Sequence, residues 1–407
     1  MPFVYAFLGF AALIILHEAG HFVAAKAVGM RVERFSLFFG PMLLKKKWGE
    51  TEYGIAAIPL GGYVKITGMN PREELAEEDE LKQLHARLNE VREELETNAQ
   101  DAARDEVLRT EHDALNARIR NVQSELDAIR RRAYYNQKVW KRIVVILAGP
   151  AVNLLIAFLI LWGLFLANGE AVPTKRVFSV RTGTPAARVL KPGDRIVSVD
   201  GVTGPTSAIQ DEIRSHRCVS AQTDGCLAGT PVRVVVRRGG HMLTFALRPR
   251  YVAKDGNMEL GFGFDTGQKP VSAGRAASLT VTGLWTVTKS TVSVVARIFE
   301  PQQRKQLHGV VGGYTVTEQS FSQSPTLAFQ VLALISLSLA VINLFPFLPL
   351  DGGHVFWALA EKVRGKRIPF EVMERAGVVG FALILIIFVI GLSNDISTLT
   401  GSGFNVR

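Results

Sequence analysis

Four long apolar stretches divide the chain, and each is long enough to cross a membrane as a helix. A helix of about 20 apolar residues spans the hydrocarbon core of a bilayer. The four stretches cover residues 3–28, 139–167, 326–345 and 376–392. The hydropathy pattern therefore predicts a polytopic α-helical membrane protein with about four transmembrane helices.

A different pattern follows the first apolar stretch. Residues 53–66 are rich in β-branched and aromatic side chains, and Pro59 and the pair Gly61-Gly62 interrupt them. This composition predicts a short sheet or hairpin. Two interpretations stay open: a plain surface hairpin, or a strand edge that binds an extended substrate through main-chain hydrogen bonds.

Residues 73–132 contain neither glycine nor proline and repeat leucine, isoleucine or valine at spacings of three and four. The repeat breaks between residues 97 and 101. Because both ends must return to the membrane, we expect an antiparallel helical hairpin with coiled-coil packing. The insert is either a solvated structural element or a docking arm for a cytoplasmic partner.

Short strands are expected again in residues 178–250, where β-branched runs alternate with Gly-Asp and Asp-Gly turns. Residues 272–299 carry few charges and a broad apolar face, which predicts an amphipathic helix lying on the outer surface. The glycine-rich residues 309–314 are expected to form a flexible connection to the third apolar stretch.

These patterns divide the chain into nine parts. In order they are a first transmembrane helix at 1–30, a membrane-associated β region at 31–71, a cytoplasmic helical hairpin at 72–133, a second transmembrane helix at 139–168, an extracytoplasmic β-rich domain at 173–268, an outer amphipathic helix at 272–300, a third transmembrane helix with a following short helix at 326–364, a fourth transmembrane helix at 370–393 and an extracytoplasmic tail at 394–407.

Charge adds an orientation to this picture. The chain has 407 residues, is 48% hydrophobic and carries a net charge of +10, with lysine and arginine clustered beside the apolar stretches. Because such clusters mark cytoplasmic connections, we expect both termini and residues 169–325 outside the cytoplasm. Basic and aromatic residues are not interleaved, so no nucleic-acid partner is expected.

The two cysteines, Cys218 and Cys226, both lie in the region expected outside. Neither has the cysteine or histidine neighbours of a zinc ribbon. Because that compartment is oxidising and the loop between them is short, we predict a disulfide.

The first apolar stretch contains His17-Glu18-Ala19-Gly20-His21. On a helix, residues four apart face the same way, so both imidazoles can bind one metal ion, with Glu18 beside them as a candidate general base. The alternative is a chance motif with hydrogen-bonded core histidines. Unpaired polar groups in an apolar setting cost several kcal/mol, so the metal site is favoured.

A third ligand is expected from Asp351, at the end of the third apolar stretch. Pro346 and Pro349 prevent a continuous helix there, and broken backbone at membrane depth is tolerated where it lines a cavity. Catalytic zinc commonly takes three protein ligands. Asp351 could instead cap the following helix, and His354 is the rival ligand.

Taken together, these motifs resemble the site-2 proteases (family M50), which are intramembrane zinc metalloproteases, and in particular the bacterial regulator-of-sigma-E type. The resemblance rests on the His-Glu-x-x-His motif, on Gly61-Gly62-Tyr63-Val64-Lys65, on turns like those of PDZ domains, and on Asn343-x-x-Pro-x-x-Pro-Leu-Asp351-Gly. It implies zinc bound by His17, His21 and Asp351, with Glu18 as catalytic base. It also implies that Asn343 and Asn153 contact the substrate.

This resemblance implies cleavage of single-pass membrane proteins, such as anti-sigma factors, by an enzyme of the bacterial inner membrane whose active site faces the cytoplasmic side. Besides the substrate, membrane lipid is an expected partner. The chain departs from the family in having one PDZ-like domain where two are usual, in the insert at 72–133, and in lacking Ser-Gly-Pro before the third apolar stretch. The rival function from another class is a non-catalytic PDZ-containing membrane scaffold.

Overall fold

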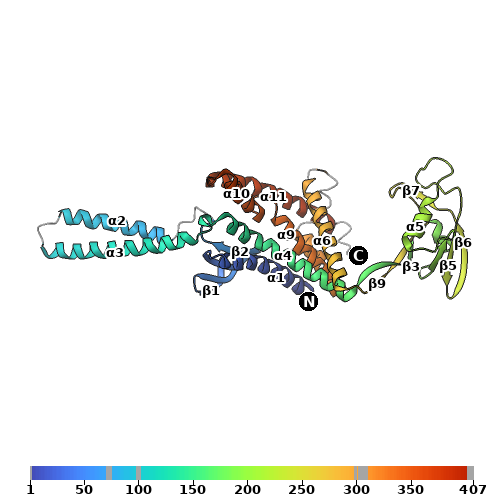
Figure 1. Cartoon of the computed structure of the whole chain (residues 1–407), viewed down its shortest axis with the longest axis horizontal. Helices are drawn as coiled ribbons and strands as arrows, with labels where there is room; N and C mark the ends of the chain where they lie inside the picture. The colour runs from blue at the N-terminus through green and yellow to red at the C-terminus, as the bar shows by residue number, and fades with distance from the viewer. Residues whose placement is uncertain (1, 70–75, 98–101, 298–299, 301–309, 401–407) are drawn as a thin grey trace. The chain divides into compact units, whose positions relative to one another are not determined.

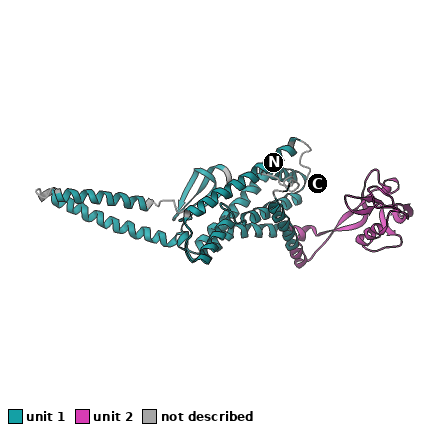
Figure 2. Ribbon diagram, turned by 90° about the horizontal axis from the view of Figure 1, so that it is seen from above, with its two compact units in different colours: residues 1–162, 280–407 teal, residues 163–279 magenta. Residues whose placement is uncertain are grey.

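A computed structural model describes residues 2–69, 76–97, 102–297, 300 and 310–400. The chain divides into two compact units, shown in Figure 2. Unit 1 comprises residues 1–162 and 280–407, and unit 2 comprises residues 163–279.

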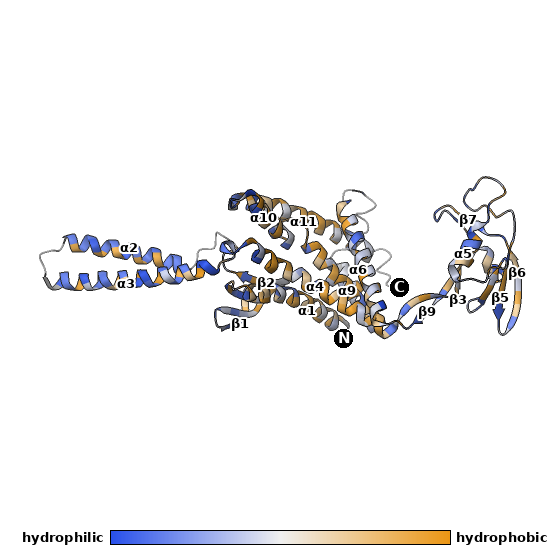
Figure 3. Ribbon diagram, viewed as in Figure 1, coloured by the Kyte–Doolittle hydropathy of each residue, from blue (hydrophilic) through white to orange (hydrophobic). Residues whose placement is uncertain are grey.

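Among the residues that the structure describes, four helices are long and apolar enough to cross a membrane, as the hydropathy pattern predicted. They are α1 (Pro2–Ala27), α4 (Val139–Asn168), α9 (Pro325–Asn343) and α11 (Phe370–Thr400). Their ribbons are coloured mostly as hydrophobic residues in Figure 3. Many apolar side chains of these helices remain exposed, which suits contact with lipid.

Part of helix α6 (Ala273–Ala296) packs against this bundle. Its Leu284 and Val287 join a core formed by Ala157 of α4 and by Leu337 and Val341 of α9. We expected an amphipathic helix on the outer surface. Leu284 and Val287 pack on α4 and α9, whereas Trp285 of the same helix is 64% exposed, so a position on the outer membrane surface stays a prediction.

The glycine-rich residues expected as a flexible connection begin a further helix, α8 (Val310–Gln323). The backbone N–H of Gly312 donates to the carboxylate of Asp395 on α11 at 2.7 Å. The Tyr314 hydroxyl donates to the Phe3 carbonyl of α1 at 3.2 Å. Contacts from distant parts of the chain therefore stabilise a helix that its own sequence does not favour.

The β region of unit 1 is a sheet of two long, bent strands, β1 (Val32–Trp48) and β2 (Thr51–Ile66). The first half of β1 pairs with both halves of β2, since Leu37 lies opposite Ile55 on one side and opposite Gly62 on the other. Residues 61–66 thus form an edge, with a strand partner on one side only among the described residues. The sheet is larger than expected because residues 32–48 join it.

Helices α2 (Ala76–Thr97) and α3 (Ala102–Arg132) lie side by side and are mostly hydrophilic (Figures 1 and 3). Ion pairs join Arg87 to Glu111 and Arg118 to Glu80, so the helices run antiparallel. Buried apolar side chains lie between them, namely Leu88, Val91, Leu108, Ile119, Val122 and Leu126. Coiled-coil geometry itself stays a prediction.

A 3-10 turn, Tyr134–Asn136, connects α3 to α4, and α10 (Asp351–Arg364) follows α9 after a proline-rich turn. Arg142 of α4 forms an ion pair with Glu361 of α10 at 2.5 Å. The Tyr134 ring lies 4.9 Å from the Arg142 guanidinium. These contacts hold α10, which follows the third apolar stretch, against the first turns of α4.

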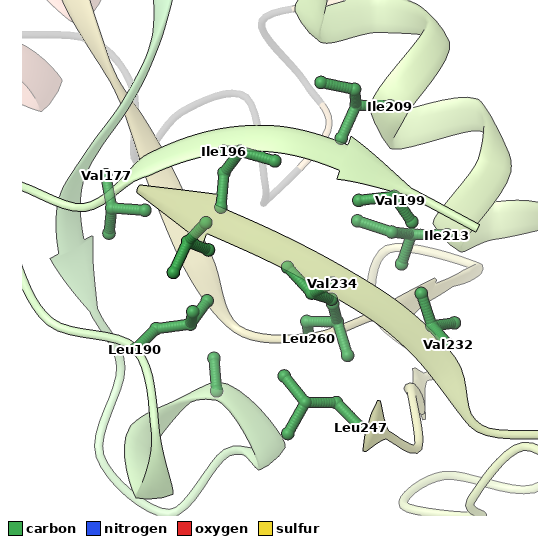
Figure 4. Close-up of a cluster of buried hydrophobic side chains, with 12 residues drawn as sticks. Val177, Leu190, Ile196, Val199, Ile209, Ile213, Val232, Val234, Leu247 and Leu260 are labelled. Carbon is green, nitrogen blue, oxygen red and sulfur yellow. The ribbon is translucent and has the colours of Figure 1, made fainter. Parts of the chain in front are cut away.

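Unit 2 contains a five-stranded sheet in the order β6-β5-β4-β3-β9. The elements are β3 (Glu170–Val180), the 3-10 turn Pro185–Arg188, β4 (Arg195–Val199), α5 (Thr206–Ser215), β5 (Val232–Arg238), β6 (His241–Leu247), β7 (Arg250–Val252), β8 (Asn257–Glu259) and β9 (Phe262–Lys269). One face of the sheet packs on α5 around the buried side chains of Figure 4. Cys218 and Cys226 are joined by a disulfide.

Candidate metal centre

His17 and His21 lie on one face of α1, as their spacing of four requires. Both side chains are buried, with 6% and 7% of their surface exposed. Their Nε2 atoms are 3.3 Å apart. Two metal-binding nitrogens therefore converge on one point inside the helical bundle.

Asp351, the first residue of α10, brings a carboxylate to the same point. Its Oδ2 lies 3.3 Å from Nε2 of His17 and 3.3 Å from Nε2 of His21. The N-cap position of α10 is Leu350, and it makes no side-chain capping bond. Asp351 therefore faces the two histidines and does not cap its own helix.

The three ligand atoms form a nearly equilateral triangle that fits a zinc ion. A tetrahedral zinc site has metal–ligand distances of about 2.0–2.1 Å, which places its ligand atoms about 3.3–3.4 Å apart. Oδ2 of Asp351 is buried without a hydrogen bond. A buried carboxylate oxygen normally has a partner, and a cation bound by all three atoms would provide one.

His21 is oriented from behind by α4. Its Nδ1 donates to the carbonyl oxygen of Val145 at 2.8 Å, which leaves Nε2 as the acceptor that can bind a metal. Gly149 makes room for the ring, because a Cβ at this position would lie 2.2 Å from Nε2 of His21. The sequence alone did not identify Val145 or Gly149 as part of the site. Only Gly149, which stands beside a proline within an apolar stretch, could have been recognised from the sequence.

His17 is contacted by two asparagines. Nδ2 of Asn153 lies 3.1 Å from Nδ1 of His17, and Nδ2 of Asn343 lies 3.4 Å from its Nε2. Asn153 is fully buried, and its Oδ1 has no hydrogen-bond partner. The backbone carbonyl of Asn153 accepts from Ser336 of α9 at 2.8 Å.

Glu18 lies beside the edge strand of the β region. A Cβ at Gly62 would approach Cγ of Glu18 to 2.4 Å, so only glycine fits there without displacing the carboxylate. Gly61 has a positive φ of 78°, and the Tyr63 ring packs on Phe39 with centroids 5.6 Å apart. The structure thus places residues 61–63 next to the His-Glu-x-x-His segment.

His354, the rival ligand, is not among the three residues whose ligand atoms converge. Burial lowers the pKa of its imidazole to about 4. The ring is therefore neutral near pH 7 and lies one turn along α10 from Asp351.

Unit 2 contains a second group of possible ligands, Asp200, Glu212 and His216. Both ring nitrogens of His216 already have partners, since Nε2 lies 3.1 Å from Asp200 and Nδ1 lies 2.9 Å from the Thr230 hydroxyl. These hydrogen bonds account for the cluster, and we assign no metal to it.

Comparison with known proteins identifies a family and several relatives. The model of the family described as peptidase family M50 matches residues 5–387. The zinc metalloprotease RasP of Shouchella clausii is 27% identical over 96% of this chain and 97% of its own length. The metalloprotease MmpA of Caulobacter vibrioides is 27% identical over 95% of this chain and 93% of its own length.

Proposed function

The chain belongs to peptidase family M50, and from this premise we propose that it cleaves single-pass membrane proteins within or next to their transmembrane segments. It is a metalloprotease, and its cofactor is zinc. The observation that carries the proposal is the triangle formed by His17, His21 and Asp351 between apolar helices. Such a position suits a peptide bond inside or near the bilayer.

In the proposed site, His17, His21 and Asp351 hold the zinc ion, and Glu18 is the general base. A zinc ion held there would lower the pKa of a water molecule to about 7 and would polarise a peptide carbonyl. Glu18 removes a proton from the attacking water and passes it to the leaving amine. Glu18 suits this role because it is adjacent to His17 and only partly buried.

The substrate is held in an extended form along residues 61–66. A peptide bond in a closed helix cannot be attacked, so the segment must unwind, and pairing with a strand edge satisfies its backbone groups. The strand of residues 61–66 pairs with β1, and its Gly62 lies next to Glu18. We assign Gly61, Gly62 and Tyr63 to this pairing and Asn343 to a contact beside the scissile bond.

Asn153 takes a different role in this proposal. It is fully buried against His17, so we assign it to orienting that histidine and not to the substrate contact expected from the sequence. If the side-chain amide of Asn153 is flipped by 180°, its Oδ1 accepts a hydrogen bond from Nδ1–H of His17. This arrangement satisfies the unpaired Oδ1 and points the Nε2 lone pair toward the metal.

The wider role we propose is regulated intramembrane proteolysis in the inner membrane of a bacterium, with an anti-sigma factor or a similar protein as substrate. The relatives are bacterial metalloproteases, and the lysine and arginine clusters support an active site toward the cytoplasm with both termini outside. Unit 2 acts as a PDZ-like domain that screens substrates, and the helical hairpin is a docking arm or a structural insert.

The test is co-expression of a single-pass membrane substrate with the wild-type chain or with Glu18→Gln. We expect the variant to retain about one zinc per chain and to leave the substrate intact, whereas the exposed control Glu125→Gln cleaves normally. Cleavage by Glu18→Gln at the wild-type rate would refute the assignment. Absence of zinc from the purified wild-type protein would favour the scaffold.

A further inference from the structure

Three arginines form a row across the sheet of unit 2. Arg176 of β3 lies opposite Arg195 of β4, and Arg195 lies opposite Arg237 of β5. All three side chains are exposed. Because these residues are direct cross-strand neighbours, the three guanidinium groups occupy one surface; we call this row the arginine stripe.

The arginine stripe lies on the face of the sheet opposite the core. The residues that alternate with it, Val177, Ile196 and Val236, are all buried in the cluster that packs on α5. Figure 4 shows Val177 and Ile196 within that cluster. Since successive side chains of a strand point to opposite faces, the arginines point away from α5.

No carboxylate of the described residues lies within ion-pairing distance of the stripe, although other arginines of unit 2 are paired. Arg238 contacts Asp194 at 2.7 Å, and Arg275 contacts Glu170 at 2.9 Å. Like charges directly opposite each other on neighbouring strands are destabilising. The row therefore costs stability in the isolated protein, and an external anion would remove that cost.

The residues around the arginine stripe indicate that this external anion belongs to a lipid surface. Phe178, two residues after Arg176, and Met242, opposite Arg237, are 69% and 57% exposed. Unit 2 as a whole has 16 lysines and arginines against 9 acidic residues. Arginine binds phosphate groups in bidentate fashion, and exposed aromatic and aliphatic side chains suit the apolar layer beneath lipid headgroups.

We propose that the arginine stripe binds the phosphate headgroups of anionic phospholipids. A peptide partner would use a sheet edge or a groove, whereas the stripe crosses three adjacent strands of an open face. Unit 2 also follows an apolar helix directly in the chain, since β3 begins two residues after Asn168 of α4. This tether keeps the local concentration of lipid high for a weak, multivalent contact.

The experiment uses the full chain in nanodiscs of phosphatidylcholine, with or without phosphatidylglycerol. A fluorophore at Thr244→Cys, exposed on β6, reports contact through a quencher on the lipid headgroup. We expect strong quenching only with phosphatidylglycerol, and its loss at high salt. Arg176→Gln/Arg195→Gln/Arg237→Gln should reduce quenching to the phosphatidylcholine level.

The matched control removes three exposed charges elsewhere in unit 2, through Arg188→Gln/Arg248→Gln/Lys254→Gln, and should retain most of the quenching. The stripe variant should unfold at a temperature no lower than wild type, because it loses like-charge repulsion. Equal quenching in both lipids, or equal loss in the control, would overturn the proposal. So would stripe-dependent binding of poly-glutamate without quenching by lipid, which would identify an acidic protein as the partner.

Discussion

The imidazole of His21 donates through Nδ1 to the carbonyl oxygen of Val145, 2.8 Å away and 124 residues further along the chain. This hydrogen bond selects the tautomer whose Nε2 faces His17 and Asp351. A backbone carbonyl of helix α4 therefore determines which ring nitrogen of His21, on α1, is available to bind a metal.

Gly149→Ala should weaken zinc binding. The new Cβ would lie 2.2 Å from Nε2 of His21, so the ring must leave its position. Changes next to metal ligands typically cost about 10–100-fold in affinity. Competition with a chelator measures the loss, and Gly163→Ala in the same helix, where nothing lies within 4 Å, is the control. Equal zinc affinity in the two variants would contradict the placement of His21.

Substitutions of Asn153 should separate an acceptor role from a donor role. Asn153→Ala removes the partner of Nδ1 of His17 and should reduce zinc affinity about tenfold or more. Asn153→Asp keeps an acceptor oxygen and should retain most of the affinity. If the aspartate variant binds zinc as weakly as the alanine variant, the amide donates to His17 and the proposed orientation is wrong.

Gly62→Ala should lower kcat while zinc content stays at the wild-type level. The added methyl would meet Cγ of Glu18 at 2.4 Å and push the carboxylate from the attacking water. A misplaced general base costs about 10²–10⁴-fold. Ala57→Val, at an exposed position of the same strand, serves as the control. Loss of zinc together with activity would indicate a collapsed site and not a displaced base.

Glu50 should make the stability of the β region depend on pH. Hydrogen bonds from Arg132, and then from Lys26, lower the pKa of its carboxyl to about 2 against partial burial. A lowered pKa means that the stabilisation is complete above the ordinary value near 4.5 and is lost as the pH falls toward 2. At pH 7, Glu50→Gln should cost about 1–3 kcal/mol after allowance for solvent screening.

Hydrogen exchange of residues 32–66 at pH 7 and pH 3 measures this effect. The wild-type region should lose protection at the lower pH, and the variant should change less. The exposed pair Arg87–Glu90 offers a control, because Glu90→Gln removes a surface ion pair that contributes little. Identical pH dependence in wild type and Glu50→Gln would count against the role of Glu50.

Cys218 and Cys226 should be recovered as a disulfide from protein purified without reductant. Mass spectrometry of an alkylated, non-reduced digest measures the linkage. Since disulfides persist in oxidising compartments, the result also bears on the side of the membrane that unit 2 occupies. Two alkylated thiols would argue against both the bond and an extracytoplasmic position.

Much of the architecture could be predicted from local sequence. The four apolar helices follow from composition alone, and the spacing of four between His17 and His21 places both on one face of α1 because helix periodicity is a local property. Pro346 and Pro349 likewise predicted the break in the backbone before Asp351. These features depend on neighbours in sequence, so no knowledge of the fold was needed.

What the sequence did not reveal depends on partners far along the chain. The hydrogen bond from His21 uses a backbone carbonyl, which every residue carries, so nothing marks Val145 as special. Helix α8 contains a glycine pair that weakens it locally, and Asp395 supplies a contact from 83 residues away.

By itself, then, the sequence determined which residues carry metal-binding and acid–base groups, and on which apolar segments they lie. Only the tertiary structure brought Asp351 to within 3.3 Å of both histidines and set Gly62 against Glu18. The physical reason is that ligand geometry depends on distances between helices, and these result from the packing of the whole bundle.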